Sequence, residues 1–79
     1  MTFADDLIKM ITTDVSLDPG ADIVGSTDLL LTGLVDSMGV LVIVAWLEDR
    51  LGIEIAPVDV VLDNFQTVDQ MLAYVDRRS

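Results

Sequence analysis

The sequence predicts an all-α fold, a small bundle of three main helices plus a short extra helix, with a long loop between the first and second helices. Three segments carry apolar residues at the i, i+3, i+4 spacing of a helix face, and a stretch rich in Pro, Gly and Asp separates the first two. A chain of 79 residues has room for one core. We therefore expect a single domain over residues 1–79.

The first helix is expected over residues 2–14, where a helical face is formed by Phe3, Leu7, Met10 and Ile11. The loop that follows is too apolar in places to be solvated. We expect it to pack over the core through Ile23, Val24, Leu29, Leu30 and Leu31.

Clear start and stop signals mark the later helices. Ser37 is a favoured N-cap for a second helix from Met38 to Leu51, and Gly52 stands just past its end. Residues 57–62 are expected to form one or two helical turns. Residues 67–70 match a capping box, and the last helix then has a predicted buried stripe of Val68, Met71, Leu72 and Val75.

The second helix has two apolar faces when its residues are placed at about 100° per residue. One is a predicted core stripe of Val40, Ile43, Val44, Leu47 and Leu51. The opposite face carries Met38, Leu41, Val42 and Ala45, with Glu48 and Asp49 below them. Trp46 lies between the faces, as a partly buried packing residue. Either the helix is buried all round, or the second face is a docking surface, as contiguous exposed apolar patches usually are. We expect the second face to bind partner proteins.

Composition excludes several classes of function. The net charge of −10, from 14 acidic and 4 basic residues, repels nucleic acid and anionic lipid, so neither nucleic acid nor a membrane is expected as a partner. The chain has no Cys and no His, and no glycine-rich phosphate loop. We expect no metal site and no enzyme, so a hydrolase or transferase is disfavoured. The sequence shows no secretory signal and no membrane span, which predicts a cytoplasmic protein.

Ser37 can be interpreted in two ways. As a structural residue it caps the second helix, a role worth roughly 1 kcal/mol. As a functional residue it presents a hydroxyl where the helix dipole and unpaired N–H groups favour a phosphodiester. Asp36 gains from the same dipole but repels a neighbouring phosphate, so the physical argument allows a modification without requiring it.

The segment "DLLLTGLVDSMGVLVIVAWLEDRLGIEI", together with the "FQTVDQMLAYV" ending, resembles the acyl and peptidyl carrier proteins. In that family an Asp-Ser pair precedes the second helix. The resemblance implies that Ser37 carries a covalent 4′-phosphopantetheine arm, attached from coenzyme A by a phosphopantetheinyl transferase. It also implies that Asp36 helps the transferase and its metal to engage. The terminal thiol of the arm would hold cargo as a thioester.

Within the family, "GLVDSMG" is similar to the discrete D-alanyl and aminoacyl carriers, which separate adenylate-forming ligases load. Fatty-acid carriers generally have an acidic residue where this chain has Val42, and a polar or acidic one at Gly39. We expect a free-standing carrier of an aminoacyl or acyl group, acting with an amino-acid or acyl ligase and a downstream transferase or synthase, in secondary metabolism or aminoacyl transfer. The alternatives are an acyl carrier protein of fatty-acid or polyketide synthesis, and an unmodified acidic interaction domain.

Overall fold

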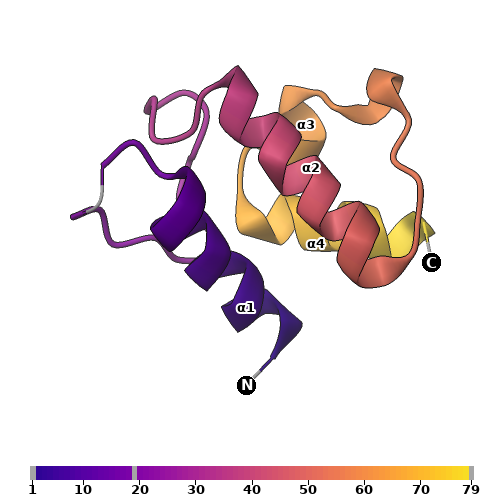
Figure 1. Cartoon of the computed structure of the whole chain (residues 1–79). Helices are drawn as coiled ribbons and strands as arrows, with labels where there is room; N and C mark the ends of the chain where they lie inside the picture. The colour runs from indigo at the N-terminus through magenta and orange to yellow at the C-terminus, as the bar shows by residue number, and fades with distance from the viewer. Residues whose placement is uncertain (1, 19, 79) are drawn as a thin grey trace.

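The structure is a computed structural model that describes residues 2–18 and 20–78. Helix α1 spans Phe3–Met10, α2 Ser37–Leu51, α3 Leu62–Phe65 and α4 Val68–Arg78. A π-helical turn, Ile11–Val15, extends α1, and a 3₁₀ turn, Pro57–Asp59, precedes α3. No strand occurs within the described ranges. Figure 1 shows α1 and α2 running in opposite directions, with α4 crossing behind α2. The predicted all-α class is confirmed, and the described residues form three main helices with a long loop after the first. The helical turns expected over residues 57–62 are a 3₁₀ turn at Pro57–Asp59, and the short α-helix starts later, at Leu62, because Val61 is extended.

The first helix begins as predicted but does not continue as a regular α-helix to residue 14. Thr2 caps α1 through a capping box, in which its Oγ1 accepts a hydrogen bond from the Asp5 N–H at 3.1 Å. After Met10 the chain widens into the π turn, and the Thr12 hydroxyl donates to the Ile8 carbonyl oxygen at 2.8 Å. Such a side-chain bond competes with the backbone ladder. The sequence-based prediction assumed 3.6 residues per turn throughout, so it could not detect the wider π turn at the end of the helix.

Asp36, not Ser37, is the N-cap of α2, which corrects the sequence-based assignment. Asp36 has an extended backbone, and its carboxylate accepts the Gly39 N–H at 2.8 Å. Ser37 is the first helical residue. Asp and Ser are about equally good caps, so their order alone did not decide between them. The other end is confirmed, because α2 ends at Gly52, which has φ 64°.

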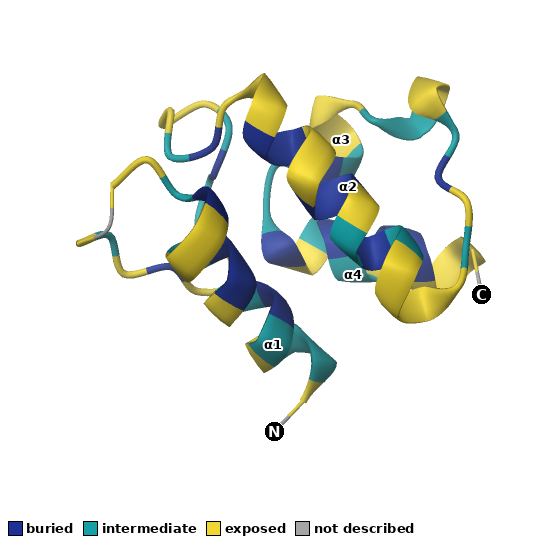
Figure 2. Ribbon diagram, in the orientation of Figure 1, coloured by how far each residue is buried: buried dark blue, intermediate teal, exposed yellow. Residues whose placement is uncertain are grey.

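The inner face of α2 is confirmed as part of the core except at its last turn. The buried residues of this face are Val40, Ile43, Val44 and Leu47. Figure 2 shows buried and exposed bands alternating along α2, as a helix with one inner and one outer face requires. Leu51 was predicted in the same stripe, but it is 40% exposed. The prediction is wrong there because the helix ends at Gly52, and Leu51 lies at the rim of a shallow groove with Phe3, Ile53, Leu72 and Val75.

The long loop covers the core with only part of its apolar residues. Ile23 and Leu29 are buried and Leu30 is half-buried, as expected. Val24 and Leu31 are 52% and 72% exposed, so the prediction that they pack inward is wrong. Leu31 lies in a tight turn that ends at Gly33, where φ is 78°, and neighbouring residues in such a turn point in different directions.

The capping box of α4 is confirmed. The Thr67 Oγ1 accepts the Gln70 N–H at 3.1 Å, and the Gln70 Oε1 accepts the Thr67 N–H at 3.0 Å. Of the predicted stripe, Val68, Met71 and Val75 are buried and Leu72 is half-buried. Tyr74, which the stripe omitted, is buried as well.

Trp46 is half-buried, as predicted for a packing residue. Its ring centroid lies 5.3 Å from that of Phe3, and the Arg50 guanidinium sits over it at 4.8 Å. This contact joins the middle of α2 to the start of α1, at a distance along the helix from Ser37.

Candidate functional site

The first turn of α2 presents an accessible hydroxyl. Ser37 is exposed, and its backbone is already helical. The first N–H groups of a helix have no partner within the helix. Of these, the Gly39 N–H is taken by Asp36, and the first helical bond is donated by Val40 to the Asp36 carbonyl oxygen at 3.0 Å. The hydroxyl therefore lies at the positive end of the α2 dipole.

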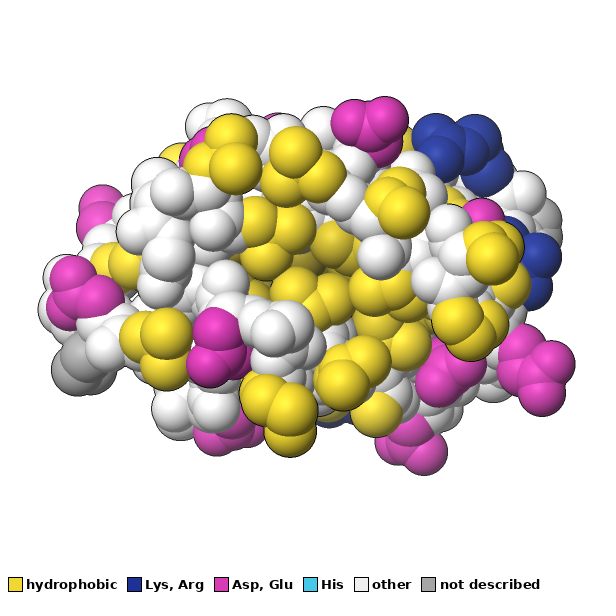
Figure 3. Space-filling model, turned by 90° about the horizontal axis from the view of Figure 1, so that it is seen from above, with side chains coloured by type: hydrophobic (Ala, Val, Ile, Leu, Met, Phe, Trp, Pro, Cys, Tyr) yellow, Lys and Arg dark blue, Asp and Glu magenta, His cyan; other side chains and the backbone are white. Residues whose placement is uncertain are grey.

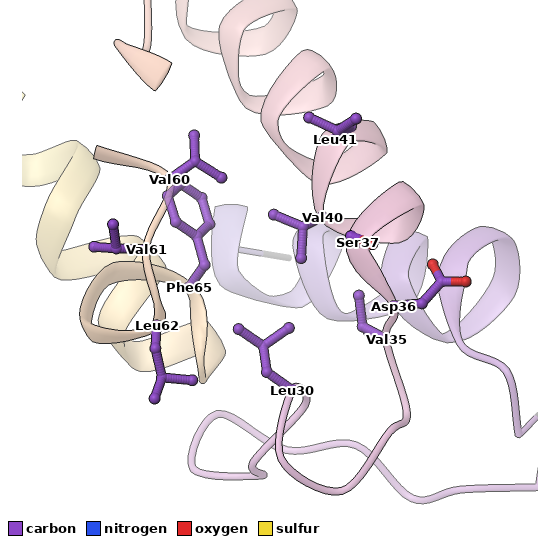
Figure 4. A pocket seen from close by; sticks show the side chains of 10 residues that line it. All are labelled: Leu30, Val35, Asp36, Ser37, Val40, Leu41, Val60, Val61, Leu62 and Phe65. Atoms are coloured by element: carbon purple, nitrogen blue, oxygen red, sulfur yellow. The ribbon is translucent and has the colours of Figure 1, made fainter. Parts of the chain in front are cut away.

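An apolar groove of about 490 Å³ opens beside this hydroxyl. Its walls come from three segments: the end of the long loop, the first turn and a half of α2, which follows that loop directly, and the more distant region from residue 60 to residue 65. Figure 4 shows Leu30, Val40 and Phe65 converging on the hollow from these segments, whereas the Asp36 carboxylate points away from it. The remaining lining residues are Val35, Ser37, Leu41, Val60, Val61 and Leu62. Among these lining residues, Asp36 and Ser37 are the polar ones.

Gly39 allows the first turn of α2 to pack closely on the π turn. A Cβ added at Gly39 would lie 2.7 Å from Val15 Cγ1 and 2.9 Å from Val35 Cγ1. No larger side chain fits without moving one of these apolar neighbours. The position of the Ser37 turn therefore depends on a close approach that the sequence-based analysis did not identify.

Two polar links hold the groove walls in place. On the loop side, the Asp28 carboxylate accepts hydrogen bonds from Gln66 Nε2 and from the backbone of Leu31 and Leu30, and the bond from Gln66 is the largest cause of its lowered pKa. On the other side, the Tyr74 hydroxyl donates to Asp59 Oδ2 at 2.8 Å. Burial, reinforced by Asp59, raises the pKa of Tyr74.

Comparison with known families decides what kind of domain this is. The family model described as a phosphopantetheine attachment site matches residues 5–75, which covers α2, α3 and the groove and most of α1 and α4. The chain belongs to the phosphopantetheine-binding carrier family. A search among curated proteins gave no match.

The carrier domain is thus an attachment site for a covalent 4′-phosphopantetheine, as the family resemblance implied. Its residues fit that group, because an exposed hydroxyl stands at a helix start beside an open groove. The terminal thiol of the arm supplies thioester chemistry that a chain without Cys lacks. Domains of this family are generally not catalytic themselves and work with transferases and synthetic enzymes.

The outer face of the carrier domain next to Ser37 is apolar. Met38, Leu41 and Val42 are 68%, 57% and 48% exposed, and Ala45 is exposed as well. The helix is therefore not buried all round. The sequence-based prediction missed a second part of this surface, made by the exposed Val61 and Leu62 across the groove. Val58, a little earlier in the chain, is exposed as well. The signal in the sequence was a run of apolar residues in a segment that has no helical periodicity, where an exposed apolar surface can form. On the face seen in Figure 3, hydrophobic side chains gather around a hollow, and acidic groups lie mainly at the periphery.

Glu48 and Asp49, at the lower end of the predicted partner face, differ in their surroundings. Glu48 is half-buried, and its Oε2 accepts the Ile55 N–H at 2.8 Å, which ties the end of α2 to the following segment. Asp49 is exposed. The Glu48 carboxylate is therefore engaged in a bond to the backbone, whereas the exposed Asp49 carboxylate faces solvent, where a partner can contact it.

Residues 2–18 and 20–78 contain no group of three or more acidic side chains placed to hold a metal ion. Within the same residues, no helix has both the length and the apolar character needed to cross a bilayer.

Proposed function

We propose that Ser37 is the residue that carries the 4′-phosphopantetheine arm of this carrier domain. The observation that carries the proposal is the exposed Ser37 hydroxyl at the first turn of α2, on the rim of the apolar groove. A phosphodiester on Ser37 Oγ gains from the helix dipole and from the unpaired N–H groups of the first turn. The attached arm starts beside the groove and beside the apolar outer face.

Asp36 has two roles in this proposal. First, Asp36 caps α2 and so fixes its first turn. Second, the hydrogen bond from the Gly39 N–H holds the Asp36 carboxylate at the start of the helix. That carboxylate points away from the groove, where a transferase and its metal ion can reach it (Figure 4). The family resemblance implies the same contact.

Intact-mass measurement tests the attachment. The apo chain, incubated with coenzyme A and a broad-specificity phosphopantetheinyl transferase, should gain the mass of one phosphopantetheine. Ser37→Ala should gain none, whereas Ser26→Ala, which removes another exposed serine, should gain one. A Ser37→Ala chain that still gains the arm contradicts the assignment. A wild-type chain that stays unmodified favours an acidic interaction domain without an arm.

The cargo proposed for the arm is an amino acid, or a small carboxylic acid derived from one, loaded by an adenylate-forming ligase and passed to a transferase or synthase. The support is the apolar partner face, in which the exposed side chains nearest Ser37 are Met38, Leu41 and Val42. A partner enzyme that binds this surface needs an apolar patch of its own rather than a row of basic residues. This surface is consistent with the similarity of "GLVDSMG" to the aminoacyl carriers.

A second candidate is an acyl carrier of fatty-acid or polyketide synthesis, and the groove favours it. Its walls are formed almost entirely by Leu, Val and Phe side chains, and about 490 Å³ is space for a short hydrocarbon chain. An amino-acid side chain of apolar character would use the same walls. The groove therefore argues for apolar cargo in either class.

Loading assays separate the two candidates. The holo chain is offered to amino-acid ligases with their substrates and, in parallel, to a malonyl transferase with malonyl-coenzyme A. The proposal predicts an aminoacyl thioester with at least one ligase and little malonyl loading. Efficient malonyl loading followed by chain elongation would establish the acyl carrier of fatty-acid or polyketide synthesis instead.

A further inference from the structure

Asp28 occupies the centre of a hydrogen-bond network in the loop that leads to Ser37. Its Oδ1 accepts the N–H groups of Leu30 and Leu31 at 3.1 and 2.9 Å, which fixes the turn that ends at Gly33. Its Oδ2 accepts from Gln66 Nε2 at 2.9 Å, across a separation of 38 residues. Of the two carboxylate oxygens, one therefore shapes the loop and the other ties it to a distant part of the chain.

The far end of this link, Gln66, is next in sequence to a residue that lines the groove. Gln66 follows Phe65, the last residue of α3, and precedes the capping box of α4. A backbone bond runs parallel to the side-chain link, because the Leu29 N–H donates to the Gln66 carbonyl oxygen at 2.8 Å. The loop is thus pinned to the junction of α3 and α4 by one backbone bond and one side-chain bond.

The same contacts reach the groove and the first turn of α2. Leu30 and Phe65, the neighbours of the linked residues, face each other across the hollow in Figure 4. The Val35 N–H donates to the Leu29 carbonyl oxygen at 2.9 Å, so the residue before Asp36 is held to the pinned part of the loop. A shift of the loop at Asp28 therefore moves one groove wall and the approach to Ser37 together.

We propose that Asp28 and Gln66 are positioning residues for the Ser37 site, which hold the loop wall of the groove against α3 in the arrangement that partner enzymes recognise. The inference rests on the proposed attachment at Ser37. Neither side chain lies in the hydrophobic core, and both are half-buried. Loss of the side-chain link leaves the backbone bond from the Leu29 N–H to the Gln66 carbonyl oxygen in place. The fold therefore persists, while the loop wall of the groove becomes more mobile.

The test compares four variants as apo substrates of the phosphopantetheinyl transferase. Gln66→Leu and Asp28→Ala break the side-chain link. Asp28→Asn is the conservative variant, because its amide oxygen can still accept the loop N–H groups and its amide nitrogen can donate to a rotated Gln66 side chain. Thr2→Ala removes the capping box of α1, far from the site, and serves as the stability-matched control.

The expected result is a drop of roughly tenfold in kcat/KM for Gln66→Leu and Asp28→Ala, mainly through a higher KM. The reason is that the loop wall then spends less time in the arrangement that the transferase binds. Asp28→Asn should stay within about twofold of the wild type, and so should Thr2→Ala despite its lower melting temperature. Amide hydrogen exchange at Val35 should be faster in Gln66→Leu than in the wild type, whereas exchange at Val44 in the middle of α2 should not change.

Two outcomes would overturn the inference. One is a Gln66→Leu chain with wild-type kcat/KM and wild-type exchange at Val35. The other is a loss of kcat/KM in Thr2→Ala as large as that in Gln66→Leu, which would trace the effect to stability alone. Both leave the attachment at Ser37 intact. A wild-type chain that gains no arm is the distinct result that overturns the proposed function.

Discussion

Asp36 and Ser37 are neighbours with separate tasks. The Asp36 carboxylate is engaged with the Gly39 N–H, and the Ser37 hydroxyl is exposed at the groove rim. Because Asp36 supplies the N-cap, Ser37 is not needed to start the helix. In the proposed function the pair therefore combines a stable helix start with a hydroxyl that can accept the arm.

Stability measurements on single variants test this division. Asp36→Ala should lower the free energy of unfolding by about 1 kcal/mol, because it removes the N-cap of α2. Ser37→Ala should change it by less than about 0.5 kcal/mol, the usual range for an exposed position without a special contact. Urea denaturation followed by circular dichroism measures both. A larger loss of unfolding free energy in Ser37→Ala than in Asp36→Ala would show that Ser37, and not Asp36, caps the helix.

Asp28 should titrate at unusually low pH. The hydrogen bond from Gln66, followed by that from the Leu31 N–H, favours the ionised carboxylate and lowers its pKa. A depressed folded-state pKa stabilises the protein above the unfolded pKa of about 3.9, and this contribution is lost as the pH falls through the folded value. An NMR titration of the Asp28 carboxyl should give a midpoint below that of an ordinary Asp, and Gln66→Leu should raise it. A midpoint that Gln66→Leu leaves unchanged would show that Gln66 is not the cause.

At the scale of elements, α2 serves two surfaces at once. Its inner face carries Val40, at 8% exposed, and Leu47, which is fully buried, while Leu41 and Val42 on the outer face are about half exposed. The outer face is continuous with the groove rim, because Leu41 also lines the groove. One helix therefore closes the core and presents the surface around Ser37.

Aspartate substitutions separate these two surfaces. Val40→Asp and Leu47→Asp would bury an unpaired charge, and the penalty is comparable to the whole stability of a domain of this size, on the order of 4–12 kcal/mol. Both variants should be unfolded in a thermal melt. Leu41→Asp and Val42→Asp should remain folded but should be loaded poorly. Melts that show the opposite order would refute the assignment of the faces.

The helices and the inner face of α2 were predictable from sequence because they depend on local period and on end signals such as Thr67 and Gly52. The groove was not predictable. Leu30, Val40 and Phe65 come from three segments, and their convergence depends on how the elements pack. Leu31 and Leu51 were misplaced for a related reason, since a turn and a helix end change the direction of a side chain without changing the apolar pattern.

At the scale of the whole molecule, charge and apolar surface are separated. The chain carries a net charge of −10, yet the surface around the groove exposes Met38, Leu41, Val61 and Leu62. Figure 3 shows acidic side chains mainly outside this area and the basic side chains at one edge. We expect acidic charge to keep the protein dispersed and to steer partners at long range, and apolar contact to provide most of the docking energy.

Salt dependence tests this distribution of roles. Because screening weakens exposed charge pairs far more than apolar burial, loading of the holo chain by its ligase should fall by less than about threefold between roughly 0.05 and 0.5 M salt. Initial rates of thioester formation at fixed ligase concentration measure the effect. A collapse of the rate over this range would show that acidic residues such as Asp49 govern docking.

The central claim is that Ser37 alone carries the arm, and fragmentation of the intact holo-protein in a mass spectrometer tests it most directly. The added phosphopantetheine mass should appear in every fragment that contains Ser37 and in none that ends before it. Treatment that ejects the arm should restore the apo mass of the same fragments. Added mass that maps to Ser16, Ser26 or any other hydroxyl, with Ser37 unmodified, would contradict the claim.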